Sequence, residues 1–328
     1  MTEPATTGPR YLITGAQGMV GRYLTAHILA EDKDAHVLGL GRSASLPGFF
    51  THSVTINGKQ QRAPVPKDLV IQGRYRYQQL SLLMTDRLRE VVERFEPTVV
   101  FHLAAALHTA TEPELFAVNV EGTRSLMSAL ANTKALVILG GSAGVYGDGS
   151  LPLSESQPCN PNDLYGITKL AAEQIVRVKA ARSGLGFISA RIFNLVGAGQ
   201  SENYVCGRIA AQLAAATKPT TLSAGPVEAT RDFIDVRDVA AALLLLAQKG
   251  ERGGAYNIAT GRETPIHVIL SELVRIAGLK GQVEIVSKPP EAVSRQVGKT
   301  ARLRRIGFTP THSLQQSLED LFNYHRAL

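Results

Sequence analysis

The chain has very little cysteine. Only two of its 328 residues are cysteines, Cys159 and Cys206, and they stand far apart with no CxxC pair. This excludes a disulfide framework and lacks the ligand spacing of a structural zinc site, so we expect no bound metal. Such cysteine usage fits the reducing cytoplasm, where we expect this protein to reside.

Long apolar stretches are absent as well. No run of about 18 or more apolar residues, the length that crosses a bilayer, occurs anywhere in the chain. The opening segment, MTEPATTGPR, has no apolar core of the kind found in export signals. We therefore expect neither a membrane span nor a secretory leader.

The charge is moderately basic, with 35 lysines and arginines against 28 acidic residues and a formal net charge of +7. The basic residues are dispersed, with no basic stripe interleaved with aromatics, so a nucleic-acid partner is not expected. A nucleotide diphosphate would suit this charge, although a basic surface without a function explains it about as well.

Apolar runs alternate with helical patterns along the first two thirds of the chain. The runs RYLITG, HVLGL and ALVILGG are separated by segments with helical spacing, such as residues 19–30 and 85–95. Continuous apolar strands divided by helices indicate a parallel sheet covered on both faces. The sequence therefore predicts an α/β protein with a Rossmann-like, doubly wound sheet.

The second part of the chain is less regular and predicts a smaller, discontinuous α+β lobe. We expect a dinucleotide-binding domain in residues 1–193 with a return segment at 231–260. Residues 194–328, mainly 194–230 and 261–328, form the expected substrate lobe. One insertion, residues 43–74, carries Asn57-Gly58 between two short β-like runs, which predicts a hairpin near the cofactor edge. No function follows from it, and a decorative surface loop is the alternative.

The stretch LITGAQGMVG places Gly15, Gly18 and Gly21 directly after the first strand. Glycines there allow a tight turn and close approach of the backbone to a pyrophosphate, which the following helix attracts with its free N–H groups. We expect the dinucleotide to contact this turn, the loops after the next strands and a later helix, at Gly15, Gln17, Gly18, Met19, Val20, Gly21, Arg42, Ser43, Leu80, Leu103, Ala104, Ala105, Tyr165 and Lys169.

The end of the second strand, LGLGRS, lacks the acidic residue that would bind a ribose 2′-hydroxyl. It offers Arg42 and Ser43, a cation and a hydroxyl suited to a 2′-phosphate. NADP(H) is therefore favoured, with NAD(H) still possible. Arg42 could instead stack on adenine or face solvent.

Three polar residues are candidates for catalysis. In LYGITK, Tyr165 and Lys169 stand four residues apart, which places them on one face of a helix. Ser142 ends the apolar run LVILGGS, at the carboxyl edge of the sheet where ligands of such folds bind. Taken alone, the pair could be packing and the serine could cap a turn; together they converge on one crevice.

These motifs occur in an order that resembles a known family. Besides TGAQGMVG and YGITK, the chain contains HLAA at 102–105, NVEGT at 119–123, SAGVYG at 142–147, RIFNLVGAGQ from 191, RDFIDVRDVAAAL from 231 and YNIATG from 256. Over nearly its whole length it is similar to extended short-chain dehydrogenase/reductases, the epimerase, dehydratase and reductase family that modifies nucleotide sugars.

The resemblance implies roles for the site residues. Tyr165 would be the general acid or base for a sugar oxygen, and Ser142 would hold that oxygen. Lys169 would bind the nicotinamide ribose and lower the pKa of the tyrosine. His102 would pack and Asn119 would order backbone. The substrate would be bound by Asn194, Arg208, Arg231 and Lys288.

The favoured function is NADP(H)-dependent reduction of a nucleotide-linked 4-keto-6-deoxy sugar, because the motifs look most like those of GDP-4-keto-6-deoxy-mannose reductases. Dehydratases carry an Asp-Glu pair where Ala143 and Gly144 stand, so dehydration is not expected. An NAD-dependent nucleotide-sugar 4-epimerase is the alternative. A non-catalytic dinucleotide-binding regulator is another, although such proteins commonly lose the tyrosine or lysine. The resemblance also implies a homodimer formed through helices at 114–131 and 161–183.

Overall fold

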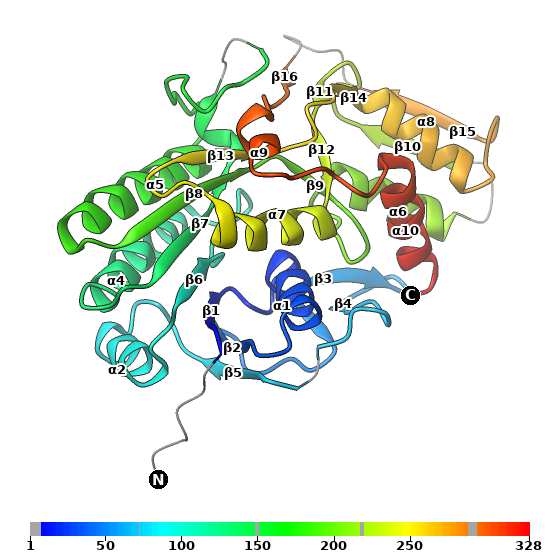
Figure 1. Cartoon of the computed structure of the whole chain (residues 1–328). Helices are drawn as coiled ribbons and strands as arrows, with labels where there is room; N and C mark the ends of the chain where they lie inside the picture. The colour runs from blue at the N-terminus through cyan, green and yellow to red at the C-terminus, as the bar shows by residue number, and fades with distance from the viewer. Residues whose placement is uncertain (1–7, 72, 148–150, 217–219, 288–293) are drawn as a thin grey trace.

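The computed structural model describes the chain apart from residues 1–7, 72, 148–150, 217–219 and 288–293 (Figure 1). Its centre is a seven-stranded sheet in the order β13-β8-β7-β6-β1-β2-β5, in which every neighbouring pair is parallel. The strands are β1 (Arg10–Thr14), β2 (His36–Gly41), β5 (Tyr75–Gln79), β6 (Val99–His102), β7 (Leu136–Ser142), β8 (Gly186–Ile192) and β13 (Ala255–Ile258).

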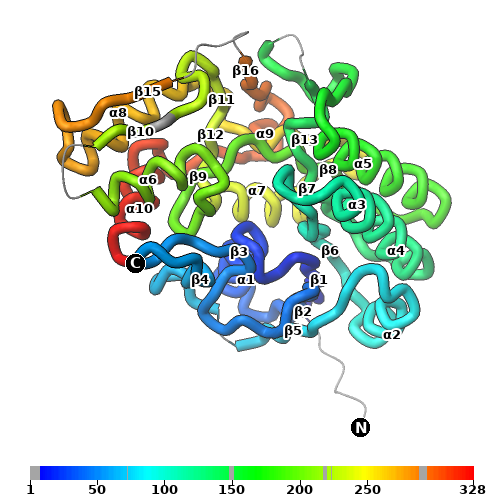
Figure 2. The backbone as a smooth tube through the Cα atoms, turned by 180° about the vertical axis from the view of Figure 1, so that it is seen from behind, coloured from blue at the N-terminus to red at the C-terminus, as the bar shows by residue number. Residues whose placement is uncertain are grey.

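Helices cover both faces of this sheet. α1 (Met19–Glu31) and α7 (Val236–Lys249) lie on one face, and α2 (Thr85–Phe95), α4 (Gly122–Ala129) and α5 (Leu164–Ser183) lie on the other (Figures 1 and 2). Successive strand residues point to opposite faces, so Ile13 packs in the cluster with α1 and α7 while Leu12 packs in the cluster with α2, α4 and α5. The predicted Rossmann-like fold is confirmed.

The helix predicted over 114–131 is not continuous. The chain forms α3 (Glu112–Leu115), a π-helical segment η1 (Phe116–Glu121) and then α4. The wider turn accommodates Asn119, whose side chain reaches back to the backbone N–H and carbonyl of Ala106 at 2.8 and 3.1 Å. Such bulges often occur at functional sites, and here it orders the loop after β6.

The predicted hairpin is present as β3 (Phe49–Ile56) and β4 (Lys59–Pro64), an antiparallel pair beside α1 (Figure 1). Asn57 and Gly58 at its tip have φ values of 51° and 72°. Both positive values match the two-residue hairpin turn that Asn-Gly favours.

A smaller lobe lies at one end of the sheet around its own hydrophobic cluster, which includes Ile209, Leu270 and Leu321 (Figure 1). It contains α6 (Val205–Ala215), β10 (Thr220–Ala224), α8 (Ile266–Ile276), β15 (Val283–Ser287) and α10 (Leu314–Arg326). The linking elements are β9 (Asn194–Val196), β11 (Thr230–Arg231), β12 (Phe233–Asp235), β14 (Thr264–Pro265), β16 (Arg295–Gln296) and α9 (Ala301–Arg305). Within the described residues, no helix is long and apolar enough to span a membrane.

Candidate active site

The glycine-rich turn brings β1, α1 and the loop after β6 into close contact. Gly15 has φ +71°, and a Cβ there would lie 2.8 Å from the backbone nitrogen of Ala104 and 2.9 Å from the carbonyl carbon of Leu103. A Cβ at Gly21 would lie 2.4 Å from the carbonyl oxygen of Gly15. Only glycine allows this approach, and the N-terminus of α1 beyond it presents N–H groups that fit a pyrophosphate.

Gln17 has a structural task within this turn. Its buried side chain donates to the Ser43 hydroxyl at 3.1 Å and to the Ala44 carbonyl at 3.0 Å, and it accepts from the Leu46 N–H. These bonds fix the segment after β2 against the glycine turn. A contact between Gln17 and a dinucleotide therefore falls to its backbone.

Arg42 stands at the end of β2 with its side chain 62% exposed. Its Nη1 lies 3.2 Å from a carboxylate oxygen of Glu114 in α3, and its carbonyl accepts from Gln79 at 2.9 Å. An exposed ion pair of this kind is weak, so the guanidinium can exchange Glu114 for a phosphate. Leu80, also among the expected contacts, is buried directly after β5.

The loop after β6 is held from beneath by two buried side chains. His102 shares hydrogen bonds with the hydroxyls of Thr14 at 2.8 Å and Thr123 at 2.9 Å, and burial lowers its pKa to about 3. The imidazole is thus a neutral packing group, as expected. Asn119, which also bonds the Thr168 hydroxyl at 3.0 Å, joins this loop to α5.

Ser142 and Tyr165 meet at the carboxyl edge of the sheet. Ser142 ends β7, and its hydroxyl accepts from Gly144 N–H at 3.0 Å in the short helix η2 (Ala143–Tyr146). Tyr165 lies in the first turn of α5, which Asp163 caps by accepting from Gly166 N–H at 2.6 Å. The two hydroxyl side chains lie close enough for Ser142 to affect the pKa of Tyr165. β7 and α5 thereby bring together two of the three predicted catalytic residues.

The pKa of Tyr165 is raised, mainly because the phenol is buried, and the neighbouring Ser142 hydroxyl offsets this only in part. Burial therefore favours the protonated phenol. The Lys169 ammonium donates to the Gly140 carbonyl at 2.6 Å. That Lys169 lowers the pKa of the tyrosine stays a prediction.

Lys169 is itself buried, with 4% of its surface exposed. Burial lowers its pKa to about 8, and Glu173, one helical turn further along α5, partly restores it. Glu173 in turn pairs with Arg191 of β8, with Nη2 at 2.6 Å and Nε at 3.1 Å from the carboxylate. Ser189 donates to the same carboxylate at 2.8 Å.

This buried ion pair continues to η2. Arg191 Nη1 donates to the Tyr146 hydroxyl at 3.0 Å, and Tyr146 donates to the side-chain oxygen of Asn257 at 2.6 Å. This network of Glu173, Arg191, Tyr146 and Asn257 connects α5, β8 and η2. It was not predicted from the sequence. Its only local signal is the four-residue spacing of Lys169 and Glu173, since the other partners are distant in sequence.

The expected substrate residues are spread over the linking elements and the smaller lobe. Asn194 in β9 donates weakly to the Gln296 side chain at 3.3 Å and bonds the Asp232 carbonyl through its backbone at 3.1 Å. Arg231 in β11 donates to the carbonyls of Thr230 at 2.8 Å and Ser294 at 3.0 Å.

Neither arginine expected to bind substrate has an acidic partner within the described part of the chain. Burial lowers the pKa of Arg231, whose guanidinium donates to two backbone carbonyls. Arg208 lies half-buried in α6. Both guanidiniums can therefore accept an anion. Lys288, the fourth expected residue, lies outside the described residues.

Two aromatic residues not predicted from sequence pack together, and one of them, Tyr204, lies near Tyr165. Tyr204, the residue before α6, is close enough to contribute to the raised pKa of Tyr165. Its ring meets His108 edge-on, with ring centroids 5.6 Å apart. His108 follows the HLAA motif and Tyr204 follows the RIFNLVGAGQ motif, but neither belongs to the motif itself. Their contact is therefore visible only in the folded structure.

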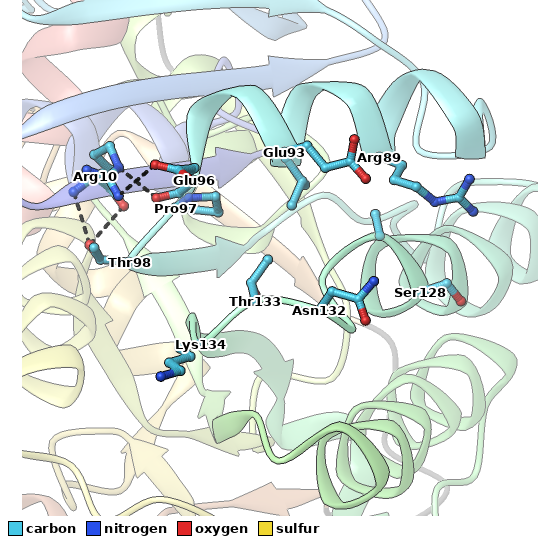
Figure 3. A pocket seen from close by; sticks show the side chains of 12 residues that line it. Arg10, Arg89, Glu93, Glu96, Pro97, Thr98, Ser128, Asn132, Thr133 and Lys134 are labelled. Carbon is cyan, nitrogen blue, oxygen red and sulfur yellow. Dashed lines mark hydrogen bonds and ion pairs between the residues drawn. The ribbon is translucent and has the colours of Figure 1, made fainter. Parts of the chain in front are cut away.

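A pocket of about 490 Å³ lies elsewhere, between α2 and α4 (Figure 3). Its lining includes Arg10, Thr98 and Lys134, which stand at or just before the starts of β1, β6 and β7. Arg10 is already bonded to the Glu96 carbonyl and to the Thr98 hydroxyl. Because parallel sheets bind ligands at the carboxyl ends of their strands, this pocket is at the wrong edge to be the active site.

Comparison with known proteins agrees with this geometry. The model of the NAD dependent epimerase/dehydratase family matches residues 11–259. The chain is 29% identical over 334 residues to GDP-6-deoxy-D-mannose reductase of Pseudomonas aeruginosa, with 96% of each protein covered. It is 30% identical over 338 residues to dTDP-6-deoxy-L-talose 4-dehydrogenase (NAD(P)(+)) of Kitasatospora kifunensis, covering 98% of this chain and 97% of that protein.

A solved structure has the same fold over nearly the full length. RMD from Pseudomonas aeruginosa, complexed with NADPH, gives a TM-score of 0.79 at 26% identity, covering 97% of this chain and 99% of that one. The family match spans the glycine turn, Ser142, Tyr165 and Lys169, and the cradle at Gly15 fits a nicotinamide dinucleotide. The chain belongs to the NAD dependent epimerase/dehydratase family, the extended short-chain dehydrogenase/reductases that act on nucleotide sugars.

Proposed function

We propose that this protein reduces a nucleotide-linked 4-keto-6-deoxy sugar with NADPH. The observation that carries the proposal is the placement of Tyr165, in the first turn of α5, beside Ser142 at the end of β7, in a buried position that favours the neutral phenol. Reduction of a ketone places negative charge on its oxygen, which then needs a proton. A neutral phenol is already in the form that donates one.

Each catalytic side chain has a distinct part in this reaction. The dinucleotide, when bound at the glycine turn, supplies the hydride. Ser142 holds the carbonyl oxygen by hydrogen bonding, and Tyr165 donates its proton to that oxygen. Lys169 keeps a positive charge below Tyr165 and can turn from the Gly140 carbonyl to a ribose hydroxyl, since both are acceptors within reach of a flexible ammonium.

Two features favour a nucleotide sugar as the substrate. Arg231 and Arg208 have no acidic partner among the described residues, and guanidinium groups bind diphosphates bidentately. The relatives named above act on GDP- and dTDP-linked 6-deoxy sugars. Ala143 and Gly144 provide no acid or base next to Ser142, so elimination of water is not part of the proposal.

A 4-epimerase that retains NAD is the second candidate. The observation in its favour is the ion pair of Arg42 with Glu114, which occupies the cation that would bind the 2′-phosphate of NADPH. An epimerase must first oxidise its substrate, however, and this step needs Tyr165 as a base. The raised pKa of the phenol makes that form harder to reach.

The first experiment is to denature the purified protein, identify any released dinucleotide and titrate the remaining protein with NADPH and NADH. Turnover is then measured with GDP- and dTDP-linked 4-keto-6-deoxy sugars. We expect an empty site that prefers NADPH and a Tyr165→Phe variant at least a hundredfold slower. Tyr11→Phe, a buried tyrosine of β1, is the matched control. Tightly retained NAD together with interconversion of nucleotide-sugar epimers would refute the reductase proposal and support the epimerase.

We also propose a homodimer through η1, α4 and α5. The large apolar side chains of Phe116, Leu164, Ile167 and Val178 are each 40–42% exposed on these elements. Pairing α4 and α5 with their copies would cover them. Analytical ultracentrifugation tests this, and an Ile167→Glu variant should sediment as a monomer if the contact is correct.

A further inference from the structure

The β3–β4 hairpin interrupts the alternation of strands and helices, and its sequence suggests no task. In the described part of the chain it forms a separate two-stranded sheet that pairs with no strand of the central one. It is nevertheless not a loosely attached surface loop, because Phe50, Val54 and Ala63 are fully buried. A segment that buries this much apolar surface is fixed to what it covers.

One end of the hairpin is fixed to the cofactor turn. Thr51 N–H donates to the Gln17 carbonyl at 3.1 Å, and Gln17 lies between Gly15 and Gly18. The nearly buried Arg22 of α1 donates to the carbonyl of Phe49 at 2.6 Å and also to that of Leu46. The start of β3 therefore moves with the glycine-rich turn and with α1.

The same strand holds the segment 198–204, which leads into α6. Gly199 has φ +84°, and a Cβ there would lie 2.4 Å from the ring of Phe50, so the ring packs directly on the backbone. His52 stacks on Phe50 at 5.2 Å between ring centroids and lies close enough to the backbone of Gly199 for it to affect the pKa of the imidazole. The hairpin thus covers this segment with two stacked rings.

A carboxylate completes the connection. Glu202 accepts from the Thr55 N–H at 2.5 Å and from the Thr55 hydroxyl at 2.8 Å, with one oxygen for each donor. Two residues later comes Tyr204, which stands against His108 and near Tyr165. On the far side, Tyr324 of α10 donates to the Pro64 carbonyl at 2.8 Å, which secures β4 to the smaller lobe.

We infer that the hairpin is a positioning element of the active site, acting through Glu202. It ties the glycine turn to segment 198–204 so that Tyr204, and Arg208 in the next turn, are held at the substrate side of Tyr165 before the substrate arrives. This rests on the proposed function, since it assigns a nucleotide diphosphate sugar to that side. Pre-organisation of this kind improves substrate affinity without touching the dinucleotide.

The test compares Glu202→Ala with wild type in three measurements: the Kd of NADPH, the Kd of the nucleoside diphosphates GDP, dTDP and UDP by calorimetry, and amide hydrogen exchange over 198–206. We expect nucleoside diphosphate binding to weaken roughly tenfold, because bonds to a charged acceptor are lost. Exchange should accelerate in 198–206. The affinity for NADPH should stay within about twofold of wild type. With a substrate that the enzyme turns over, KM should rise by a larger factor than kcat falls.

Matched variants separate positioning from folding. Glu202→Gln keeps an oxygen acceptor for Thr55 and should recover most of the affinity, and Thr55→Val removes one donor and should give a smaller loss. Glu31→Ala, an exposed carboxylate at the end of α1, controls for charge. Unchanged nucleoside diphosphate affinity in Glu202→Ala, or a wild type that binds none of these nucleotides, overturns the inference. A wild type that binds both ligands but reduces no keto sugar refutes the proposed function alone.

Discussion

Replacing Glu173 by glutamine should destabilise the protein by about 3–5 kcal/mol, the cost of leaving a buried charge without its partner. The Glu173 side chain is 10% exposed and that of Arg191 is 6% exposed. Three donors converge on the carboxylate, two from Arg191 and one from Ser189. The variant keeps the shape of the side chain but leaves two buried cations, Lys169 and Arg191, around a neutral amide.

The loss should depend on pH in a defined direction. Burial lowers the pKa of Lys169 to about 8, below its ordinary value of 10.5, and Glu173 opposes this lowering. Between those two values the unfolded chain binds more protons than the folded one, so stability increases as pH rises through that window. Without Glu173 the pKa of Lys169 in the folded protein should fall further, so the pH range over which stability rises should begin below pH 8. Glu173→Gln should therefore be most destabilised near pH 6 and recover part of the loss by pH 9.

Arg191→Met provides the contrasting case. It removes the same ion pair and the bond to Tyr146, yet leaves Glu173 to neutralise Lys169. It should lose stability without the recovery between pH 6 and pH 9. Urea unfolding followed by circular dichroism measures both variants, with Glu90→Gln on the exposed face of α2 as the charge-matched control. A loss below about 1 kcal/mol, or equal losses at both pH values for Glu173→Gln, would refute the reasoning.

Three further predictions concern the hairpin and the cofactor. Gly199→Ala should cost about 1–3 kcal/mol because of its φ of +84° and the contact with Phe50, and more than Gly253→Ala, which has φ +85° in open space, in urea unfolding. Burial lowers the pKa of His52 to about 4, so stability should fall as pH drops from 6.5 toward 4; a flat profile in thermal melts contradicts this. Arg42→Ala should weaken NADPH roughly tenfold and spare NADH in fluorescence titrations, whereas equal losses would assign Arg42 to adenine.

The parts of the fold with a local cause were predictable from the sequence. The helix Thr85–Phe95 has the predicted bounds because Leu88, Val91 and Val92 mark one buried face. Asn57-Gly58 fixed the hairpin because few other residues tolerate two successive positive φ values. The glycine turn likewise follows from a backbone requirement at Gly15.

Features that depend on distant partners were not predictable. The π-helical segment at 116–121 exists because Asn119 must reach Ala106 and Thr168, and apolar periodicity carries no sign of this. Thr55 and Glu202 are 147 residues apart, so their bond has no local pattern. Sequence gives the spacing of Tyr165 and Lys169 but not the degree of burial, which raises the pKa of the phenol.

The four-residue spacing of Tyr165 and Lys169 continues to Glu173, so the three side chains lie on one face of α5. Each of them faces a different residue of β7, η2 or β8. Tyr165 lies beside Ser142, Lys169 donates to the Gly140 carbonyl, and Glu173 is joined to Tyr146 through Arg191. One face of α5 thus presents a phenol, an ammonium and a carboxylate in order of increasing distance from the helix N-terminus. The carboxylate favours the charged ammonium, and because it stands one turn behind Lys169, it does so without competing for the substrate oxygen that Tyr165 would protonate in the proposed reduction.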